Sequence, residues 1–119
     1  IKLIIMTIPE FKTKLKSNPS AVIFAETMQV IENYYHFNPT AFTNGDTINN
    51  AGENNGSCKL FAFAVHQQLT EEETLCCFCE HYKNVLEDKN GTSHQNIRNF
   101  MQTGFKGLSF ENEALTLKK

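Results

Sequence analysis

The sequence predicts a single α+β domain that is rich in helix and contains one or two short antiparallel β-hairpins; an all-α structure is the alternative. Apolar residues recur at helical spacing over residues 24–35, and capping boxes open helices at Thr7 and Thr70. The dipeptide Asn44-Gly45 is typical of a two-residue hairpin turn. The length of 119 residues fits one domain with a substantial apolar core.

A short helix and a longer one are expected in the first third of the chain. Thr7 and Glu10 form the capping box of the short helix, which should run to about Lys16. Asn18 can cap the second helix, with Pro19 at its first position. The second helix should present an apolar face of two adjacent rows, which consist of Phe24, Met28, Ile31 and Tyr35 and of Ile23, Val30 and Tyr34.

A hairpin and a buried helix are expected next. Residues 40–43 and 46–49 can pair on either side of Asn44-Gly45, because this dipeptide suits a type I′ turn. The segment 58–68 is apolar enough for either a buried strand or a buried helix. Its length, and Ser57 as a cap at its start, favour the helix.

The last part of the chain should contain two helices and a second hairpin. Thr70 and Glu73 form a capping box for a helix that runs to about residue 87. A left-handed cap at Asn90-Gly91 should close this helix. The remaining expected features are a helix over residues 94–102 with Ile97, Phe100 and Met101 inward, and a hairpin formed by the apolar residues of 108–110 and 114–117.

Composition excludes two classes of partner. A net charge of -2 and a pI near 6.1 give no field that would attract nucleic acid or an anionic membrane surface. No apolar run approaches the roughly 20 residues needed to cross a bilayer, and the apolar residues at the N-terminus are too few for a signal peptide. We therefore expect neither a nucleic-acid partner nor a membrane partner, and nothing in the sequence indicates a cofactor.

The start of the domain and its compartment are predicted from two further features. The sequence Met6-Thr7-Ile8-Pro9 is typical of a natural start, so residues 1–6 should be upstream sequence together with the start, and residues 7–119 the domain. Three of the four cysteines are crowded into residues 76–79. This arrangement suits free thiols in a reducing cytosol better than a disulfide framework.

Three blocks of sequence resemble the HopJ family of type III secretion effectors. They are FAETMQVIENYYHFNPTAFTNG, NNAGENNGSCKLFAFA and NGTSHQNIRNFMQTGFKGLSF, and the similarity extends from about residue 11 to about residue 115. The resemblance implies a small bacterial α+β protein of undetermined biochemistry. Our leading hypothesis is that the protein acts by protein interaction or by binding a small ligand. The resemblance also implies a place in the bacterial cytoplasm, with delivery into a host cell if the protein is an effector.

One alternative is a cysteine-dependent hydrolase or transferase. If Ser57 caps a helix, the thiol of Cys58 lies beside free backbone amides and beside Lys59, and both would favour the thiolate. His94, at another expected helix start, could act as the base. A cysteine that precedes an apolar run is equally well explained as a core residue.

A second alternative is a binding pocket without chemistry. The residues that would hold a small anion or a peptide are Asn54, Asn55, Ser57, Arg98 and Asn99, together with His94. The loop 44–57 is too poor in apolar side chains to order itself, so it should take hydrogen bonds from neighbours. The expected donors are His94, Asn96, Arg98 and Asn99, and loss of the Arg98 side chain should destabilise the loop. The same polar groups could instead serve only to satisfy one another and the loop backbone.

No metal site is expected. Cys77 and His81 lie four residues apart, but the sequence contains no zinc-ligand spacing of the usual kind. A calcium loop that begins at Asp46 would place Ile48 at a ligand position and Ala51 where glycine is required.

Overall fold

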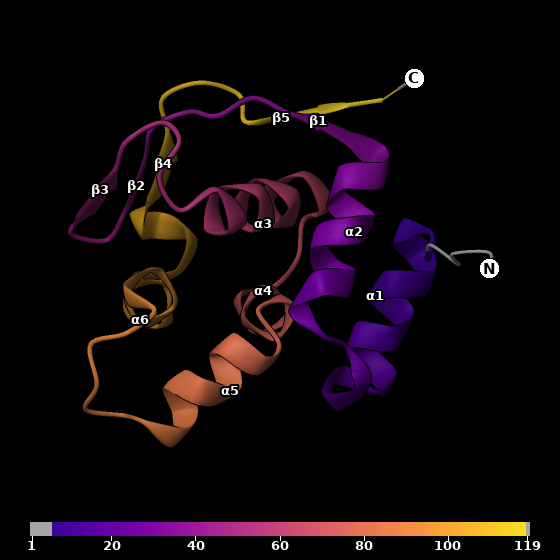
Figure 1. The fold of residues 1–119 in the computed structure, drawn as a ribbon, viewed down its shortest axis with the longest axis horizontal. Coiled ribbons are helices and arrows are strands. Elements are labelled where there is room, and N and C mark those ends of the chain that lie inside the picture. Colours follow the sequence, from indigo (N-terminus) through magenta and orange to yellow (C-terminus); the bar gives the residue numbers. More distant parts are fainter. Residues whose placement is uncertain (1–5, 119) are drawn as a thin grey trace.

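Helix α3 (Asn55–Gln67) lies at the centre of the molecule and is surrounded by the other elements (Figure 1). The computed structural model describes residues 6–118, so the expectation that residues 1–5 are upstream sequence lies outside the described residues. The residues from Leu60 to Ala64 are each 5% exposed or less. A helix that is apolar on all sides must be covered on all sides, which explains its central position and decides the choice between helix and strand for this segment.

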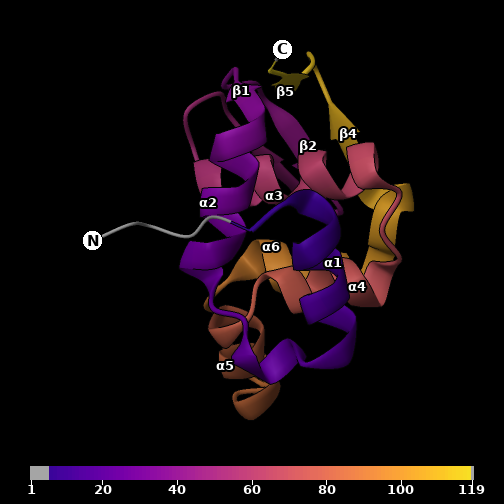
Figure 2. The ribbon, with the colours of Figure 1, turned by 90° about the vertical axis from the view of Figure 1, so that its right-hand side faces the viewer.

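The structure confirms a helix-rich α+β domain. Along the chain, the elements that surround α3 are α1 (Ile8–Ser17), η1 (Pro19–Ala21), α2 (Phe24–Tyr34), β1 (Tyr35–Phe37), β2 (Phe42–Asn44), β3 (Thr47–Asn49), α4 (Glu71–Cys77), α5 (Glu80–Glu87), α6 (Gln95–Thr103), η2 (Gly104–Gly107), β4 (Leu108–Phe110) and β5 (Leu115–Leu117). Helix α1 lies between α2 and α4 on one side of the molecule (Figure 2).

Both predicted capping boxes are present. The Thr7 amide donates to the Glu10 carboxylate at 2.8 Å, and the Glu10 amide donates to the Thr7 hydroxyl at 3.2 Å. The corresponding distances between Thr70 and Glu73 are 2.9 and 3.0 Å. These boxes begin α1 and α4 as expected, because every group that forms them lies within four residues of sequence.

The second helix begins later than predicted. Residues 19–21 form only a 3₁₀ turn, and α2 starts at Phe24 after an extended Ile23 that is 52% exposed. The Phe24 amide donates to the carboxylate of Glu80 at 2.8 Å, so α5 supplies a cap for α2. Tyr35 is buried as expected, but in strand β1 rather than in the helix.

The first hairpin exists, but its turn is displaced by one residue. Asn44 pairs with Thr47, which leaves Gly45 and Asp46 as the loop. Gly45 has a φ of +61° and Asp46 has no positive φ, so the turn is of type II′ rather than the predicted type I′, which needs a positive φ at both loop positions. Because side chains alternate along a strand, the displacement turns Asn44 into the interior, where it is 0% exposed.

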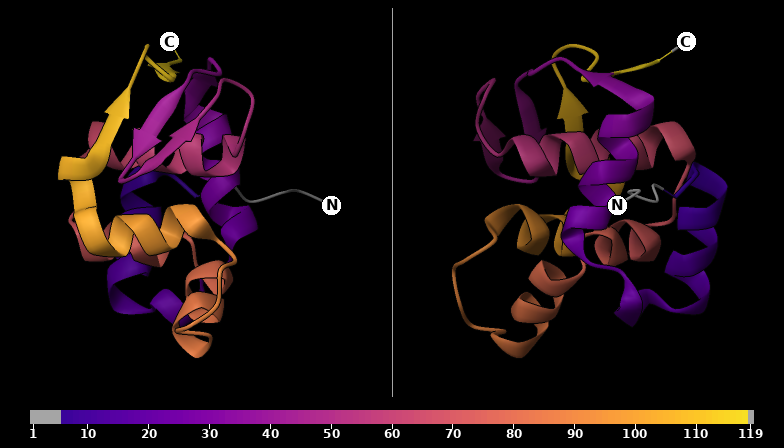
Figure 3. Two further views of the ribbon diagram at one scale, coloured as in Figure 1. Left: turned by 90° about the vertical axis from the view of Figure 1, so that its left-hand side faces the viewer. Right: turned by 45° about the vertical axis from the view of Figure 1, so that its right-hand side comes forward.

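The second predicted hairpin is wrong. Strand β4 pairs with β2 to complete a three-stranded sheet, and β5 pairs with β1 in a separate two-stranded sheet. The three-stranded sheet lies beside α3, with α6 below it (Figure 3). The two C-terminal strands therefore bond to strands from the first half of the chain instead of to each other.

The predicted helix over residues 70–87 is divided into α4 and α5. Cys79 separates them with a φ of +54° and a ψ of -119°, which no helix can contain. Asp88, with a φ of -131°, ends α5, so the left-handed cap predicted at Asn90-Gly91 is wrong. In α6, Ile97 and Phe100 face inward as predicted, whereas Met101 is 44% exposed.

Candidate functional site

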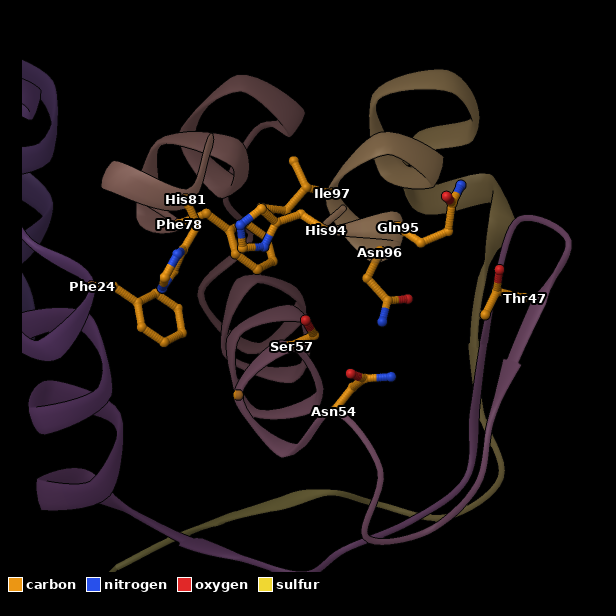
Figure 4. A pocket seen from close by; sticks show the side chains of 11 residues that line it. Phe24, Thr47, Asn54, Ser57, Phe78, His81, His94, Gln95, Asn96 and Ile97 are labelled. Atoms are coloured by element: carbon orange, nitrogen blue, oxygen red, sulfur yellow. The ribbon is translucent and has the colours of Figure 1, made fainter. Parts of the chain in front are cut away.

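A hollow of about 390 Å³ opens where the first turns of α3 and α6 meet (Figure 4). We call it the α3–α6 hollow. Its lining residues come from several elements and from the segments that join them: Phe24, Thr47, Asn54, Gly56, Ser57, Phe78, His81, His94, Gln95, Asn96 and Ile97. Rings gather on one side of the hollow and amide or hydroxyl groups on the other (Figure 4).

Helices α3 and α6 both begin at this hollow, and both begin after an N-cap residue in the left-handed conformation. The N-cap residues Asn54 and His94 both adopt the left-handed conformation, with φ values of 52° and 54°. Within residues 6–118, neither helix start receives a hydrogen bond from the side chain of its N-cap residue. The first amides of a helix have no partner inside the helix, and they carry the positive end of its dipole. The hollow therefore collects unsatisfied donors from two helices.

A buried network of asparagine side chains joins the hairpin to α6. Asn49 and Asn96 exchange hydrogen bonds of 3.0 and 3.2 Å, and the Asn44 amide group donates to the Asn96 backbone and side-chain oxygens at 2.8 and 3.0 Å. The Asn54 side chain donates to Asn49 at 2.7 Å and so ties the start of α3 to the same network. These bonds fix the two helix starts relative to each other.

Two imidazole rings stand together at the mouth of the hollow. The ring centroids of His81 and His94 are 5.0 Å apart, and the Phe24 ring meets His81 edge-on at 4.7 Å. Partial burial lowers the pKa of His94, and the neighbouring His81 and Arg98 lower it further. These effects favour the neutral form of His94 in the free protein, and a negative charge nearby would favour its protonation.

The structure brings together three of the predicted site residues and separates the others. Asn54, Ser57 and His94 line the hollow, and Asn55 is the first residue of α3 beside it. Asn99 lies on the sheet side of α6, where its side chain donates to the Asn44 carbonyl oxygen at 2.9 Å and to the Thr47 hydroxyl at 2.7 Å.

Arg98 does not support the loop 44–57, and the prediction that it does so is wrong. Its guanidinium donates to the backbone oxygens of Ser93 and Lys89 at 2.5 and 3.3 Å. The carboxylate of Asp88 lies 4.0 Å away. Arg98 thus holds the segment between α5 and α6, while Asn96 and Asn99 hold the hairpin and the start of the loop.

The prediction that Asn96 and Asn99 donate to the loop 44–57 is confirmed, since Asn96 donates to the Asn49 oxygen at 3.0 Å and Asn99 to the Asn44 carbonyl oxygen. Sequence reasoning missed Phe24 and His81 as residues of this hollow. The sequence positions of these two indicate only a core residue and a member of a cysteine–histidine pair. Their place in the hollow depends on how α2 and α5 pack.

The Cys58 thiol lies in the core rather than in the hollow. Helix α3 begins at Asn55 and not at Ser57, so the Cys58 amide already donates to the Asn54 carbonyl oxygen at 3.0 Å. The side chain is 1% exposed, and its sulfur lies 3.9 Å from the Thr40 carbonyl oxygen. Burial raises the pKa of this thiol despite the nearby Lys59. A buried thiol with a raised pKa is a poor nucleophile, so the burial and the pKa of Cys58 both argue against its activation by His94.

Two further kinds of site receive no support from the part of the chain that the structure describes. Among residues 6–118, no group of three or more histidine, cysteine, aspartate or glutamate side chains could hold a metal ion. None of the helices within these residues has the length and apolar composition needed to span a membrane.

Comparisons with known proteins agree with this fold. A sequence model of the family described as "HopJ type III effector protein" matches residues 8–115. A solved structure described as "Crystal structure of unknown function protein VPA0580" superposes with a TM-score of 0.93 at 50% sequence identity, and the match covers 97% of each chain. A search of curated proteins finds no match.

Proposed function

The chain belongs to the HopJ type III effector protein family, and from that premise we propose that it acts by binding a small anionic ligand in the α3–α6 hollow. The observation that carries this proposal is the convergence of two helix N-termini on one hollow, each begun by a left-handed residue. Backbone amides at a helix start bind carboxylate and phosphate groups without any further basic residue. A non-glycine residue held in the left-handed conformation costs free energy, and such residues concentrate at ligand sites.

The groups around the helix starts support an anion rather than a cation. His94 can become a donor with positive charge when an anion approaches, and the His81 ring lies 5.0 Å from it. The Ser57 hydroxyl adds a neutral donor at the end of the first turn of α3. The positive charge of Arg98 lowers the pKa of His94, so this charge also acts on an anion at the mouth of the hollow.

Titration of the isotope-labelled protein with inorganic phosphate and with acetate tests the proposal directly. We expect the backbone amide signals of residues 54–57 and 94–97 to move together and to saturate. His94→Asn should weaken binding at pH 6 while retaining the backbone, because asparagine also tolerates the left-handed conformation. Ser57→Ala should weaken it moderately, and Ser109→Ala, an exposed serine on β4, serves as the matched control. Signals that do not move with either anion would refute the proposal.

The family description supports a second proposal, which concerns where the protein acts. We propose that the chain is a substrate of a type III secretion apparatus and meets its ligand, or a protein partner, inside a host cell. The test is a fusion to an enzyme that is active only in host cytosol, expressed in bacteria with and without a working apparatus. Host-cell signal from both strains, or from neither, would refute delivery by this route and would leave the anion site as a bacterial function.

A further inference from the structure

We infer that the anion taken by the α3–α6 hollow carries a planar ring next to its charged group, which makes the ligand a ring-bearing phosphate or carboxylate. This inference rests on the proposed function, since it names the class of anion that the same hollow would bind. It depends on the wall of the hollow that lies away from the polar groups, and on the size of the space between them.

One wall of the hollow is a continuous row of four rings. Phe78 and Phe24 are stacked with their centroids 6.2 Å apart and an interplanar angle of 8°, and His81 and His94 extend the row from Phe24. Phe78 is 3% exposed and forms the base of the row. Phe24 and His81 are only half-buried and His94 is exposed, so the row ends in open ring surface (Figure 4). A bare inorganic anion would leave this surface uncovered.

The ring of Phe24 is held in place by neighbours from two other elements. The Glu80 carboxylate accepts a hydrogen bond from the Phe24 backbone amide at 2.8 Å, which fixes the start of α2. On the other side, a Cβ atom added to Gly56 would come within 3.3 Å of the end of the Phe24 ring. The ring therefore lies directly against the first turn of α3, beside the amides that would take the anion. A rigid ring in a fixed place stacks on a ligand with little loss of side-chain entropy.

The polar wall still has donors to offer a charged group. The amide groups of Asn54 and Asn96 are used by the asparagine network, and Gln95 donates to Asn99 at 2.8 Å. The Ser57 hydroxyl and the first-turn backbone amides remain for a ligand. The donors thus cluster at the helix starts, while the open apolar surface lies along the ring row. A ligand that satisfies both has its charge at one end and its ring at the other.

The size of the hollow agrees with a small organic molecule. A volume of about 390 Å³ lies within the range of pockets that take such ligands and exceeds the needs of a single phosphate or carboxylate group. Stacking on aromatic rings is a common way of binding planar rings of varied chemistry. One ring and one charged group would occupy both walls together.

Binding constants for matched pairs of anions test the inference. Phenyl phosphate is compared with inorganic phosphate, and benzoate with acetate, at equal pH and ionic strength. In at least one pair we expect the ring-bearing member to bind about tenfold more tightly, as one well-placed aromatic contact allows. Cyclohexyl phosphate, which is apolar but not planar, should bind more weakly than phenyl phosphate.

Two variants locate the effect. Phe24→Leu should bring the ratio between the binding constants of phenyl phosphate and inorganic phosphate close to one. Phe105→Leu replaces a ring that packs on Phe100 away from the hollow, and it should retain the ratio.

Equal binding within both pairs would overturn the ring inference while leaving the anion site intact. Equal binding of phenyl and cyclohexyl phosphate would overturn the requirement for a planar ring. Failure of all five anions to bind would overturn the inference together with the proposed function.

Discussion

The side chains of Asn49 and Asn96 donate to each other across the interior, at 3.0 and 3.2 Å, although they are 47 residues apart in sequence. Asn49 is 1% exposed and Asn96 is 7% exposed. Each amide thus satisfies the other in a place that water does not reach. The pair connects the end of the hairpin to the first turn of α6, and the geometry of the α3–α6 hollow depends on it.

Removal of one member of this pair should destabilise the protein strongly. Asn96→Ala removes the side-chain oxygen that accepts from Asn44 and Asn49 and the amide that donates to the Asn49 oxygen, and it leaves these two residues only the backbone oxygens of Asn96 and Phe42 as acceptors. We therefore expect a loss of about 1 to 3 kcal/mol in the free energy of unfolding. Asn33→Ala, at an exposed position of α2, should change it by less than about 0.5 kcal/mol. Urea denaturation of both variants measures the difference. Similar midpoints for the two would mean that the network adds nothing to stability.

Arg98→Ala should loosen the segment between α5 and α6. The substitution removes the donors to the Ser93 and Lys89 carbonyl oxygens. Amide exchange should therefore quicken over residues 88–94 and stay unchanged over residues 49–57, with the reverse pattern in Asn96→Ala. Each variant serves as the control for the other. Faster exchange over residues 49–57 in Arg98→Ala would show that Arg98 supports the loop after all.

The lowered pKa of His94 has opposite consequences for stability and for binding. In the unfolded chain the group titrates near its ordinary value of 6.5, and in the folded protein below it. Between these values the unfolded chain binds more protons, so the free energy of unfolding should fall as the pH drops below 6.5. A bound anion favours the protonated ring, so affinity for acetate, which stays ionised over this range, should rise as the pH falls.

His94→Asn should flatten both of these pH profiles, because asparagine does not titrate. His36→Asn, at an exposed position of β1, should leave them as they are. Denaturation and acetate titration between about pH 5.5 and pH 8 cover the range in which imidazoles change charge while acetate stays ionised. Acetate affinity that does not vary with pH in the unsubstituted protein would exclude a part for the His94 charge in binding.

Cys58 should be unreactive in the folded protein. Burial raises the pKa of its thiol above the ordinary value of 9.0, and its side chain is 1% exposed. Iodoacetamide labelling followed by mass spectrometry should therefore modify the half-buried Cys76 well before Cys58. Cys58→Ala should still bind phosphate. Rapid labelling of Cys58 at neutral pH would restore the cysteine-dependent enzyme as the better hypothesis.

Two isoleucines at the start and in the middle of α2 form a natural matched pair. Ile31 is 1% exposed, so Ile31→Ala should cost about 2 to 5 kcal/mol of stability. Ile23 is 52% exposed, and Ile23→Ala should cost less than about 1 kcal/mol. The difference in denaturation midpoint between the variants measures whether Ile31 lies in the core, since Ile23 is the extended residue that precedes α2. Equal losses would contradict the burial of Ile31.

Local features of the fold could be predicted from sequence because their determinants lie close together. The capping boxes at Thr7 and Thr70 each involve residues three positions apart, and the apolar run of α3 needs no partner to be recognised. The register of the hairpin could not be predicted in this way. Whether Asn44 lies in the turn or in the strand is decided by hydrogen bonds to Asn96, 52 residues away.

The candidate site was predictable in part for the same reason. Asn54, Ser57 and His94 were found because polar residues at helix starts have a local signature. Phe24 and His81 were missed because they reach the hollow only through the packing of α2 and α5 against α3. That β4 and β5 join different sheets was equally beyond prediction, since both segments have the same short apolar pattern.

The pairing of the two C-terminal strands has a consequence for the order of folding. Strand β4 pairs with β2 and completes the three-stranded sheet, and β5 pairs with β1, where Tyr35 lies opposite Leu117. Strand β1 therefore has no partner until β5 has been synthesised. During synthesis the helices that surround α3 can collapse early through local contacts, but neither sheet can close until residues 108–117 have left the ribosome. The nascent chain therefore carries exposed strand edges at β1 and β2 until residues 108–117 emerge. Before that point, these edges are the surfaces that a chaperone would recognise and through which unfinished copies would aggregate.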